Sequence, residues 1–190
     1  MKKRFVATPS QNLTTEQAEL QALIAESRNL SPQQALEGPF GPWTESPEMG
    51  QHLSRMGVFH RYNSCLNRQQ IELAILVTAK FWQAKFEWWA HKPMAMAAGV
   101  PTDVIEAIHK GTLPIFPDAR DAAIYHFVLE LHEQHHLTTP IFERAAELLG
   151  QQGVIELVGL CGYYTTVSMT LNALEIGLPD GAEDPFPEPL

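Results

Sequence analysis

Glu72, Glu87 and His91 lie close together in the sequence, inside a strongly apolar segment. Apolar surroundings raise the pKa of a carboxyl group and lower the pKa of an imidazole. Two carboxylates and one imidazole in such surroundings can donate and accept protons near neutral pH. The segment therefore predicts general acid–base catalysis.

These three side chains meet only if the chain turns between them. In one straight helix, Glu72 and Glu87 would be separated by roughly 22 Å along the axis, at about 1.5 Å per residue. A shared site therefore requires a turn near residues 81–85, where Gln83 and Lys85 are polar. Glu87 and His91 need no turn, because side chains four residues apart share one face of a helix.

A structural role for these residues is an open alternative, because a glutamate–histidine pair four residues apart is also typical of a simple ion pair. Glu72 stands within the apolar run 71–77, where an unpaired carboxylate is costly to bury. We expect Glu72 either to face solvent or to be held by Arg68, Arg61 or His91.

The elements around these residues are predicted to be helices, which makes the chain an all-α single-domain bundle. Thr14 and Asn67 are each followed three residues later by glutamine, a capping-box pattern that begins a helix. The proline- and glycine-rich aromatic segment 38–43 is predicted to be a loop that could cover a pocket. Helices are expected over 14–27, after Ser31–Pro32, after Ser46–Pro47, from 67, up to Gly99, over 102–111, 118–136, 139–149 and 151–175.

Three regions are predicted from this pattern. Residues 1–47 form a helical extension with the proline- and glycine-rich loop, residues 48–178 form the main domain, and residues 179–190 form an irregular acidic tail. The helix over 151–175 is apolar nearly all round, which is typical of a core or of a subunit interface.

Composition excludes several classes of function. The formal net charge is -9, and no basic stripe is present that would bind nucleic acid. The basic start is not followed by an apolar signal region, and the apolar stretch 157–171 is too short to cross a membrane. Cys65 and Cys161 have no metal-binding or redox-motif spacing. We expect a soluble, cytoplasmic protein.

Other residues near this segment could line the same pocket. His60, Arg61 and Trp88 are candidates to bind a substrate, although a buried histidine or tryptophan is more often structural. The cluster His132, His135 and His136 lacks a further ligand at suitable spacing, so no metal site is predicted.

The sequence resembles the carboxymuconolactone decarboxylase family, which includes the alkylhydroperoxidase-D-like proteins. The resemblance covers about residues 48–178 and is carried by the segments 59–62, 68–76, 86–91, 156–164 and 169–173. It implies an all-α fold that assembles into homotrimers or homohexamers, with the site at or near a subunit interface.

The resemblance also distinguishes two branches of chemistry. The peroxidase branch has Cys-x-x-Cys-x-x-x-His with a glutamate 19 residues before the histidine. Here Glu72 and His91 keep that spacing, but the two cysteine positions are Ala84 and Glu87. A dithiol peroxidase needs a thiolate and a resolving thiol, so this alkylhydroperoxidase or peroxiredoxin-type alternative is disfavoured.

The decarboxylase-like branch has an aromatic–glutamate–aromatic segment before the histidine, which residues 86–88 match. The resemblance then implies a lyase that removes CO2 from a small cyclic carboxylic acid or lactone in the degradation of aromatic compounds, with no cofactor. Arg61 would hold a carboxylate, His91 or Glu87 would donate the proton, and Glu72 would orient His91. A hydrolase or isomerase with the same trio, and a non-catalytic oligomeric protein that binds a small ligand, are the alternatives.

Overall fold

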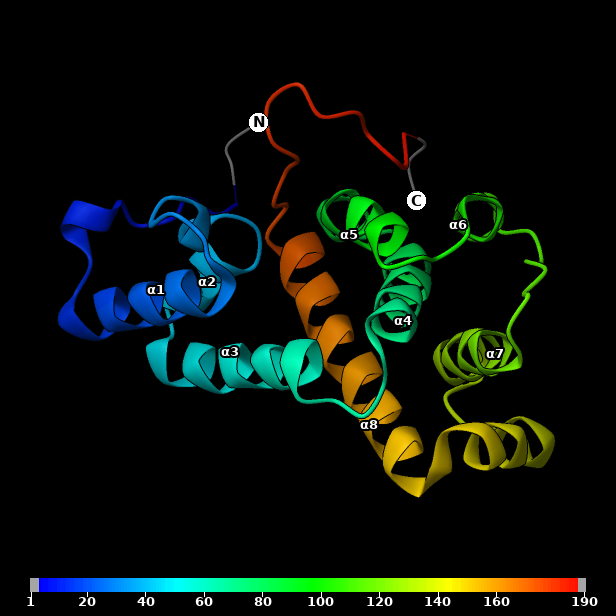
Figure 1. Ribbon diagram of the computed structural model, residues 1–190. Coiled ribbons are helices and arrows are strands. Elements are labelled where there is room, and N and C mark those ends of the chain that lie inside the picture. The colour runs from blue at the N-terminus through cyan, green and yellow to red at the C-terminus, as the bar shows by residue number, and fades with distance from the viewer. Residues whose placement is uncertain (1–3, 188–190) are drawn as a thin grey trace.

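The computed structural model describes residues 4–187, which contain eight α-helices, two short 3-10 helices and no strand (Figure 1). The predicted all-α fold is confirmed. In chain order the elements are the 3-10 helix Ser10–Asn12, α1 Thr15–Arg28, the 3-10 helix Gln34–Leu36, α2 Phe40–Thr44, α3 Pro47–Tyr62, α4 Arg68–Phe81, α5 Lys85–Ala97, α6 Thr102–Lys110, α7 Ala119–Gln134 and α8 Thr139–Ala173.

The helix α4 lies at the centre of the fold. Every residue from Gln70 to Ala79 is buried, and α4 packs against α5, α6, α7 and α8. Its start is fixed by the predicted capping box, in which Asn67 and Gln70 each accept a hydrogen bond from the other's backbone N–H at 3.0 Å. Glu72 is thereby placed in the middle of the core.

A tight turn joins α4 to α5, as the sequence required. Gln83 has a left-handed backbone (φ 50°), and the backbone N–H of Ala84 donates to the carbonyl of Ala79 at 2.9 Å. The side chain of Gln83 also donates to the carbonyl of Lys80 at 2.9 Å. The turn lays α5 back along α4, so residues 72 and 91 face each other despite their separation in the sequence.

The last helical segment is bent at Gly150, whose φ of 71° and ψ of 172° are not helical. The structure thus contains the two predicted helices before and after residue 150, and both bear the label α8 in Figure 1. By length and apolar composition α8 could cross a membrane, but 56% of its most apolar window is buried inside the protein. That burial is typical of the core helix of a soluble fold.

The N-terminal segment packs as a unit against α3. The helix α1 contacts α2, α3 and the short helix at 34–36, and α2 contacts α3. Two predictions here were wrong: most of the segment 38–43 belongs to α2 rather than to a loop, and only a 3-10 turn follows Ser31–Pro32. The left-handed Gly38 followed by Pro39 ends that turn before a longer helix can form.

Residues 184–186 of the irregular C-terminal tail lie against α5 and α6. Phe186 is buried with its ring 5.5 Å from that of Trp88, and the carbonyl of Pro185 lies 2.7 Å from His109 Nε2. Lys85 and Asp184 form an ion pair at 2.5 Å. These contacts hold the tail against the face of α5 that carries Trp88.

We expect Gly38→Ala to destabilise the fold by about 1–3 kcal/mol. Gly38 has a φ of 57°, and an added Cβ would lie 2.4 Å from the ring of Phe86 on α5. Urea denaturation measures the change. The control is Gly162→Ala on α8, where an added Cβ meets nothing within 4 Å; equal stability of the two variants would contradict this packing.

Candidate active site

His91 on α5 is enclosed between two carboxylates. Its Nδ1 lies 2.6 Å from Glu72 Oε2, and its Nε2 lies 2.9 Å from Glu87 Oε1. Each ring nitrogen therefore faces an acceptor, and both must carry a proton for both contacts to be hydrogen bonds. The geometry is that of an imidazolium, and the predicted trio of Glu72, Glu87 and His91 is assembled.

Electrostatics supports the same charge state. Burial alone would lower the pKa of His91, but the charge of Glu87 and the hydrogen bonds to both carboxylates outweigh it and raise the pKa to about 9. Burial acts to raise the pKa of Glu72, yet the hydrogen bond to His91 and the nearby arginines lower it overall. At neutral pH Glu72 is therefore an ionised carboxylate, and His91 beside it is protonated.

Glu72 has a second cationic neighbour. Arg68, four residues earlier on α4, places Nη2 2.5 Å from Glu72 Oε1, although that oxygen has no partner at hydrogen-bond angles. Glu72 itself is fully buried. Of the partners that the sequence offered, Arg68 and His91 both contact this carboxylate, and Arg61 contributes only through its charge.

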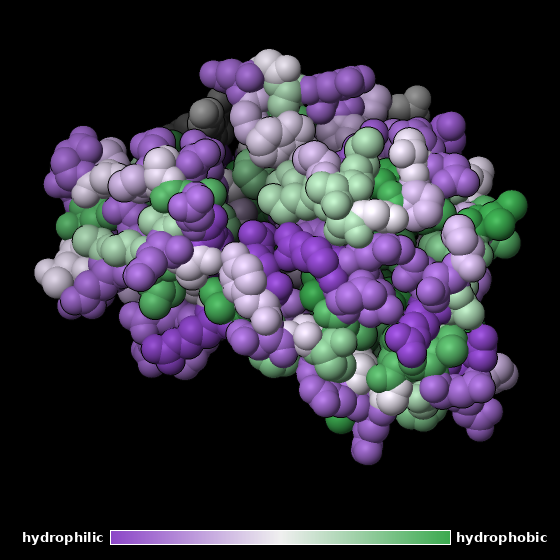
Figure 2. All heavy atoms as spheres, viewed as in Figure 1, coloured by the Kyte–Doolittle hydropathy of each residue, from purple (hydrophilic) through white to green (hydrophobic). Residues whose placement is uncertain are grey.

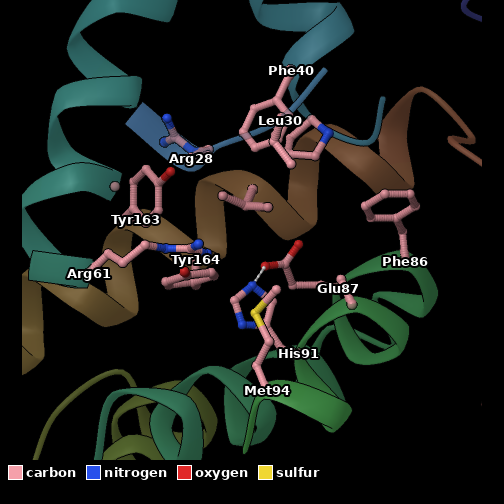
Figure 3. A pocket seen from close by; sticks show the side chains of 14 residues that line it. Arg28, Leu30, Phe40, Arg61, Phe86, Glu87, His91, Met94, Tyr163 and Tyr164 are labelled. Carbon is pink, nitrogen blue, oxygen red and sulfur yellow. Dashed lines mark ion pairs between the residues drawn. The ribbon is translucent and has the colours of Figure 1, made fainter. Parts of the chain in front are cut away.

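A cavity of about 200 Å³ opens beside His91 and Glu87 (Figure 3). It is smaller than the roughly 300–1,000 Å³ of sites for drug-sized ligands, so it fits a small molecule. Its walls come from five helices and the segment after α1, and they are largely apolar. The lining residues are Arg28, Leu30, Pro39, Phe40, Gly57, Arg61, Phe86, Glu87, Ala90, His91, Met94, Tyr163, Tyr164 and Val167.

Arg61 at the end of α3 points into this cavity from the side opposite α5 (Figure 3). Among residues 4–187 no carboxylate lies within ion-pair distance of it. An arginine that lines a cavity without a carboxylate partner can bind an anionic group of a ligand. This is where the sequence analysis expected Arg61 to act.

Two other predicted substrate-binding residues lie elsewhere. His60 is buried beside Tyr163, with ring centroids 6.0 Å apart, and it does not line the cavity. Trp88 points to the far side of α5, where it packs on His109 and Phe186. One residue of helix advance turns a side chain by about 100°, so Trp88 faces away from the cavity that its neighbour Glu87 lines.

The structure adds residues that the sequence analysis did not assign to the site. Arg28 and Tyr163 line the cavity, and Tyr164 packs edge-on against His91 with ring centroids 5.3 Å apart. The expectation that the segment 38–43 could cover a pocket is confirmed by Pro39 and Phe40. No spacing in the sequence links Arg28 to residues more than 30 positions later.

The two cysteines lie outside the cavity. Cys65 is exposed and Cys161 is buried, and both are free thiols. Burial raises the pKa of both thiols, that of Cys161 to about 12, and the neighbouring Glu156 raises that of Cys65 further. Neither site favours a thiolate.

Among residues 4–187, no group of three or more histidine, cysteine, aspartate or glutamate side chains is placed to hold a metal ion, and this includes the histidines at the end of α7. His132 is buried and its Nδ1 lies 2.9 Å from the carbonyl of Val128 one turn earlier. Its Nε2 lies 3.4 Å from the hydroxyl of Thr165 on α8, so both ring nitrogens have hydrogen-bond partners within the protein.

The helical arrangement is that of an alkylhydroperoxidase-D-like fold. Among solved structures, the chain is similar to the alkylhydroperoxidase AhpD core of an uncharacterized peroxidase-related protein from Ralstonia eutropha JMP134. The TM-score is 0.74 at 13% sequence identity, covering 93% of this chain and 92% of that chain. It is also similar to the apo structure of the debrominase Bmp8, with a TM-score of 0.72 at 8% identity, covering 92% and 91% of the two chains.

No protein-family profile and no curated protein sequence matches this chain. Identities of 8% and 13% establish the fold alone. Function therefore has to be argued from the site itself.

We expect the free energy of unfolding to fall as the pH rises from about 6.5 to about 9. His91 has its pKa raised from 6.5 to about 9 in the folded state. Its proton therefore stabilises the fold fully below pH 6.5, and this stabilisation is lost as the pH passes through 9. The loss is about 3 kcal/mol, at about 1.4 kcal/mol per pKa unit.

Chemical denaturation at a series of pH values measures this slope. His91→Gln is the matched control, because it keeps every other titrating group. The difference in stability between the wild type and this variant should shrink across the interval. A difference that stays constant from pH 6.5 to 9 would contradict a protonated His91.

Proposed function

We propose that the protein is a cofactor-free lyase that removes CO2 from a small cyclic carboxylic acid or lactone by acid–base catalysis. The observation that carries this proposal is the buried His91 imidazolium, held between Glu72 and Glu87 at the wall of a small cavity. A proton donor with a pKa near the working pH is what protonation of a carbanion requires.

The roles follow from the contacts. Glu72 is fully buried and away from the cavity, so it orients His91 and keeps it charged. His91 and Glu87 line the cavity, and the proton passes from His91 Nε2 through the carboxylate of Glu87 to the carbon that loses CO2. Arg61, which has no carboxylate partner among residues 4–187, holds an anionic group of the substrate.

The same cavity is compatible with a non-catalytic protein that binds small ligands, and with a hydrolase or isomerase that uses the same trio. The two similar structures bear the names of a peroxidase-related protein and a debrominase, so the fold hosts more than one chemistry. Thiol-based peroxide reduction has the weakest support, because neither cysteine lines the cavity.

We also propose that the chain assembles into a homotrimer or homohexamer. Several large apolar side chains are exposed in the single chain, and on α8 they include Ile155, Val158 and Met169. Figure 2 shows one face of the molecule, where hydrophobic residues reach the surface in patches between hydrophilic ones. Exposed apolar side chains on a helix are typical of a subunit interface.

The purified protein is expected to release CO2 from 4-carboxymuconolactone or from a related small β-keto or lactone acid. His91→Ala and Glu87→Gln should each lower the rate by about 10²-fold or more, because each removes a partner in proton transfer. Coupled detection of CO2 measures the rate.

His126→Ala and Glu147→Gln are the matched controls, since both side chains are exposed and lie outside the cavity. Both should leave the rate unchanged. Binding of these acids without CO2 release, by a correctly assembled wild type, would contradict the lyase and favour the binding protein.

Val158→Glu is expected to dissociate the assembly, because it places a charge on the exposed apolar face of α8, where Val158 is 47% exposed. Light scattering after size-exclusion chromatography measures the mass. Thr170→Glu, on the polar turn near the end of α8, is the control. A wild type that runs as a monomer would contradict the oligomer.

A further inference from the structure

Arg28 is held rigidly at the wall of the cavity. Its Nη1 donates to Ser27 Oγ at 2.8 Å and to Ser54 Oγ at 3.1 Å, and its Nη2 donates to the backbone carbonyl of Ser54 at 3.3 Å. The guanidinium also lies over the ring of Phe40, 5.0 Å from its centre. A cation fixed from three sides is preorganised to bind a ligand.

The guanidinium of Arg28 is not saturated by these contacts. Of the five N–H groups that an arginine carries, three are taken by Ser27 and Ser54 and a fourth faces the oxygen of Tyr163, which leaves at least one. Among residues 4–187, no carboxylate forms an ion pair with Arg28. The chain has 22 acidic and 13 basic residues, so most arginines could find a carboxylate partner. Arg28 and Arg61 line the same cavity without one in the part of the chain that the structure describes, which indicates a binding site for a negatively charged group.

The hydroxyl of Tyr163 lies beside this guanidinium. Both groups approach the bare backbone of Gly57, where an added Cβ would lie 2.3 Å from the tyrosine oxygen and 2.9 Å from Arg28 Nη2. Burial raises the pKa of Tyr163 to about 12, and Arg28 only partly opposes this. The hydroxyl therefore stays protonated and can donate a hydrogen bond.

Figure 3 shows Arg28 and Tyr163 next to each other on one side of the cavity, with Glu87 and His91 on the α5 side. A single-ring ligand between the two sides would thus meet the proton donor on α5 at one edge. At its other edge it would meet two hydrogen-bond donors, the cationic Arg28 and the neutral hydroxyl of Tyr163. This is the arrangement needed when negative charge develops at one atom while another atom is protonated.

We propose that Arg28 and Tyr163 form an oxyanion site that stabilises the enolate formed when CO2 leaves the substrate. This rests on the proposed lyase function and narrows its substrate to acids whose carboxylate is conjugated through the ring with a carbonyl. The carbon–carboxylate bond breaks, and its electron pair moves into the carbonyl to give the enolate oxygen. Arg28 and Tyr163 donate hydrogen bonds to that oxygen.

The second half-step restores the neutral product. His91 gives its Nε2 proton to Glu87, whose carboxyl group passes a proton to the ring carbon that lost CO2. The carbonyl re-forms, and His91 takes a proton from water. One substrate carboxylate and one proton thus yield CO2 and the protonated carbon, with no external oxidant or reductant. Gly57 serves the first half-step, because its missing side chain leaves room for Arg28 and Tyr163 beside the enolate oxygen.

The test uses 4-nitrophenol, a single-ring mimic of the enolate whose ionisation is visible in its absorption spectrum. The full-length wild type should bind the phenolate in preference to the phenol, lowering the apparent pKa of the bound dye by about one unit, a tenfold preference. Arg28→Gln and Tyr163→Phe should each reduce this preference about tenfold, as expected for a lost hydrogen bond to a charged group.

Tyr163→Phe keeps the net charge and the aromatic ring, so its effect cannot arise from a change in net charge. Arg120→Gln, at an exposed position outside the cavity, should leave the preference unchanged. Wild type that binds no 4-nitrophenol, or that binds it without a pKa change, would overturn the oxyanion site.

A preference that is lost in Arg61→Gln but kept in Arg28→Gln and Tyr163→Phe would also overturn it, because the charge would then reside at Arg61. The two proposals fail separately. If no acid is decarboxylated while the phenolate preference and its loss in the variants persist, the lyase fails and the oxyanion site stands.

Discussion

Burial of three ionisable side chains in one helix pair is the constraint on which the structure depends. Glu72, Glu87 and His91 are 0%, 4% and 6% exposed. Removing any one of these charges from water is costly unless a partner replaces the lost hydration. The two carboxylates replace the lost hydration of His91. His91 and Arg68 replace the lost hydration of Glu72. The group is stable only when its members are held together.

The surrounding helices supply that precision. The core around α4 fixes Glu72, and the turn at Gln83 sets the register at which α5 returns beside it. The N-terminal segment then closes the cavity with Phe40 and brings Arg28 to its wall. Rigid packing of this kind keeps donors in place before the substrate binds, which is the main requirement of electrostatic catalysis.

Much of the fold could be predicted from local signals. The capping boxes at Thr14 and Asn67, and the separation of the helices at Gly150, have direct chemical causes in the chain. The contact between Glu72 and His91 was one of several alternatives for this carboxylate, since a buried carboxylate needs a partner and a shared site with His91 requires a turn near residues 81–85. These features could be predicted because residues close together in the sequence determine them.

Other parts depend on contacts between distant segments. Trp88 follows Glu87 in the sequence, but the helical advance turns it to the opposite side of α5, where the distant tail residue Phe186 packs on it. Arg28 reaches the cavity only because α1 packs on α3, and no residue pattern announces that packing. The segment after Ser31 carries helix signals that Gly38 and Pro39 cut short. Such features need the three-dimensional arrangement.

The charge state of His91 is the centre of this account, and nitrogen NMR of protein labelled with ¹⁵N-histidine measures it directly. At pH 7.5 both ring nitrogens of His91 should have the chemical shifts of an imidazolium, with a pKa of about 9. His91→Gln identifies the signals by their loss. A neutral ring at pH 7.5, with one protonated and one unprotonated nitrogen, would contradict the proton donor on which the proposed chemistry rests.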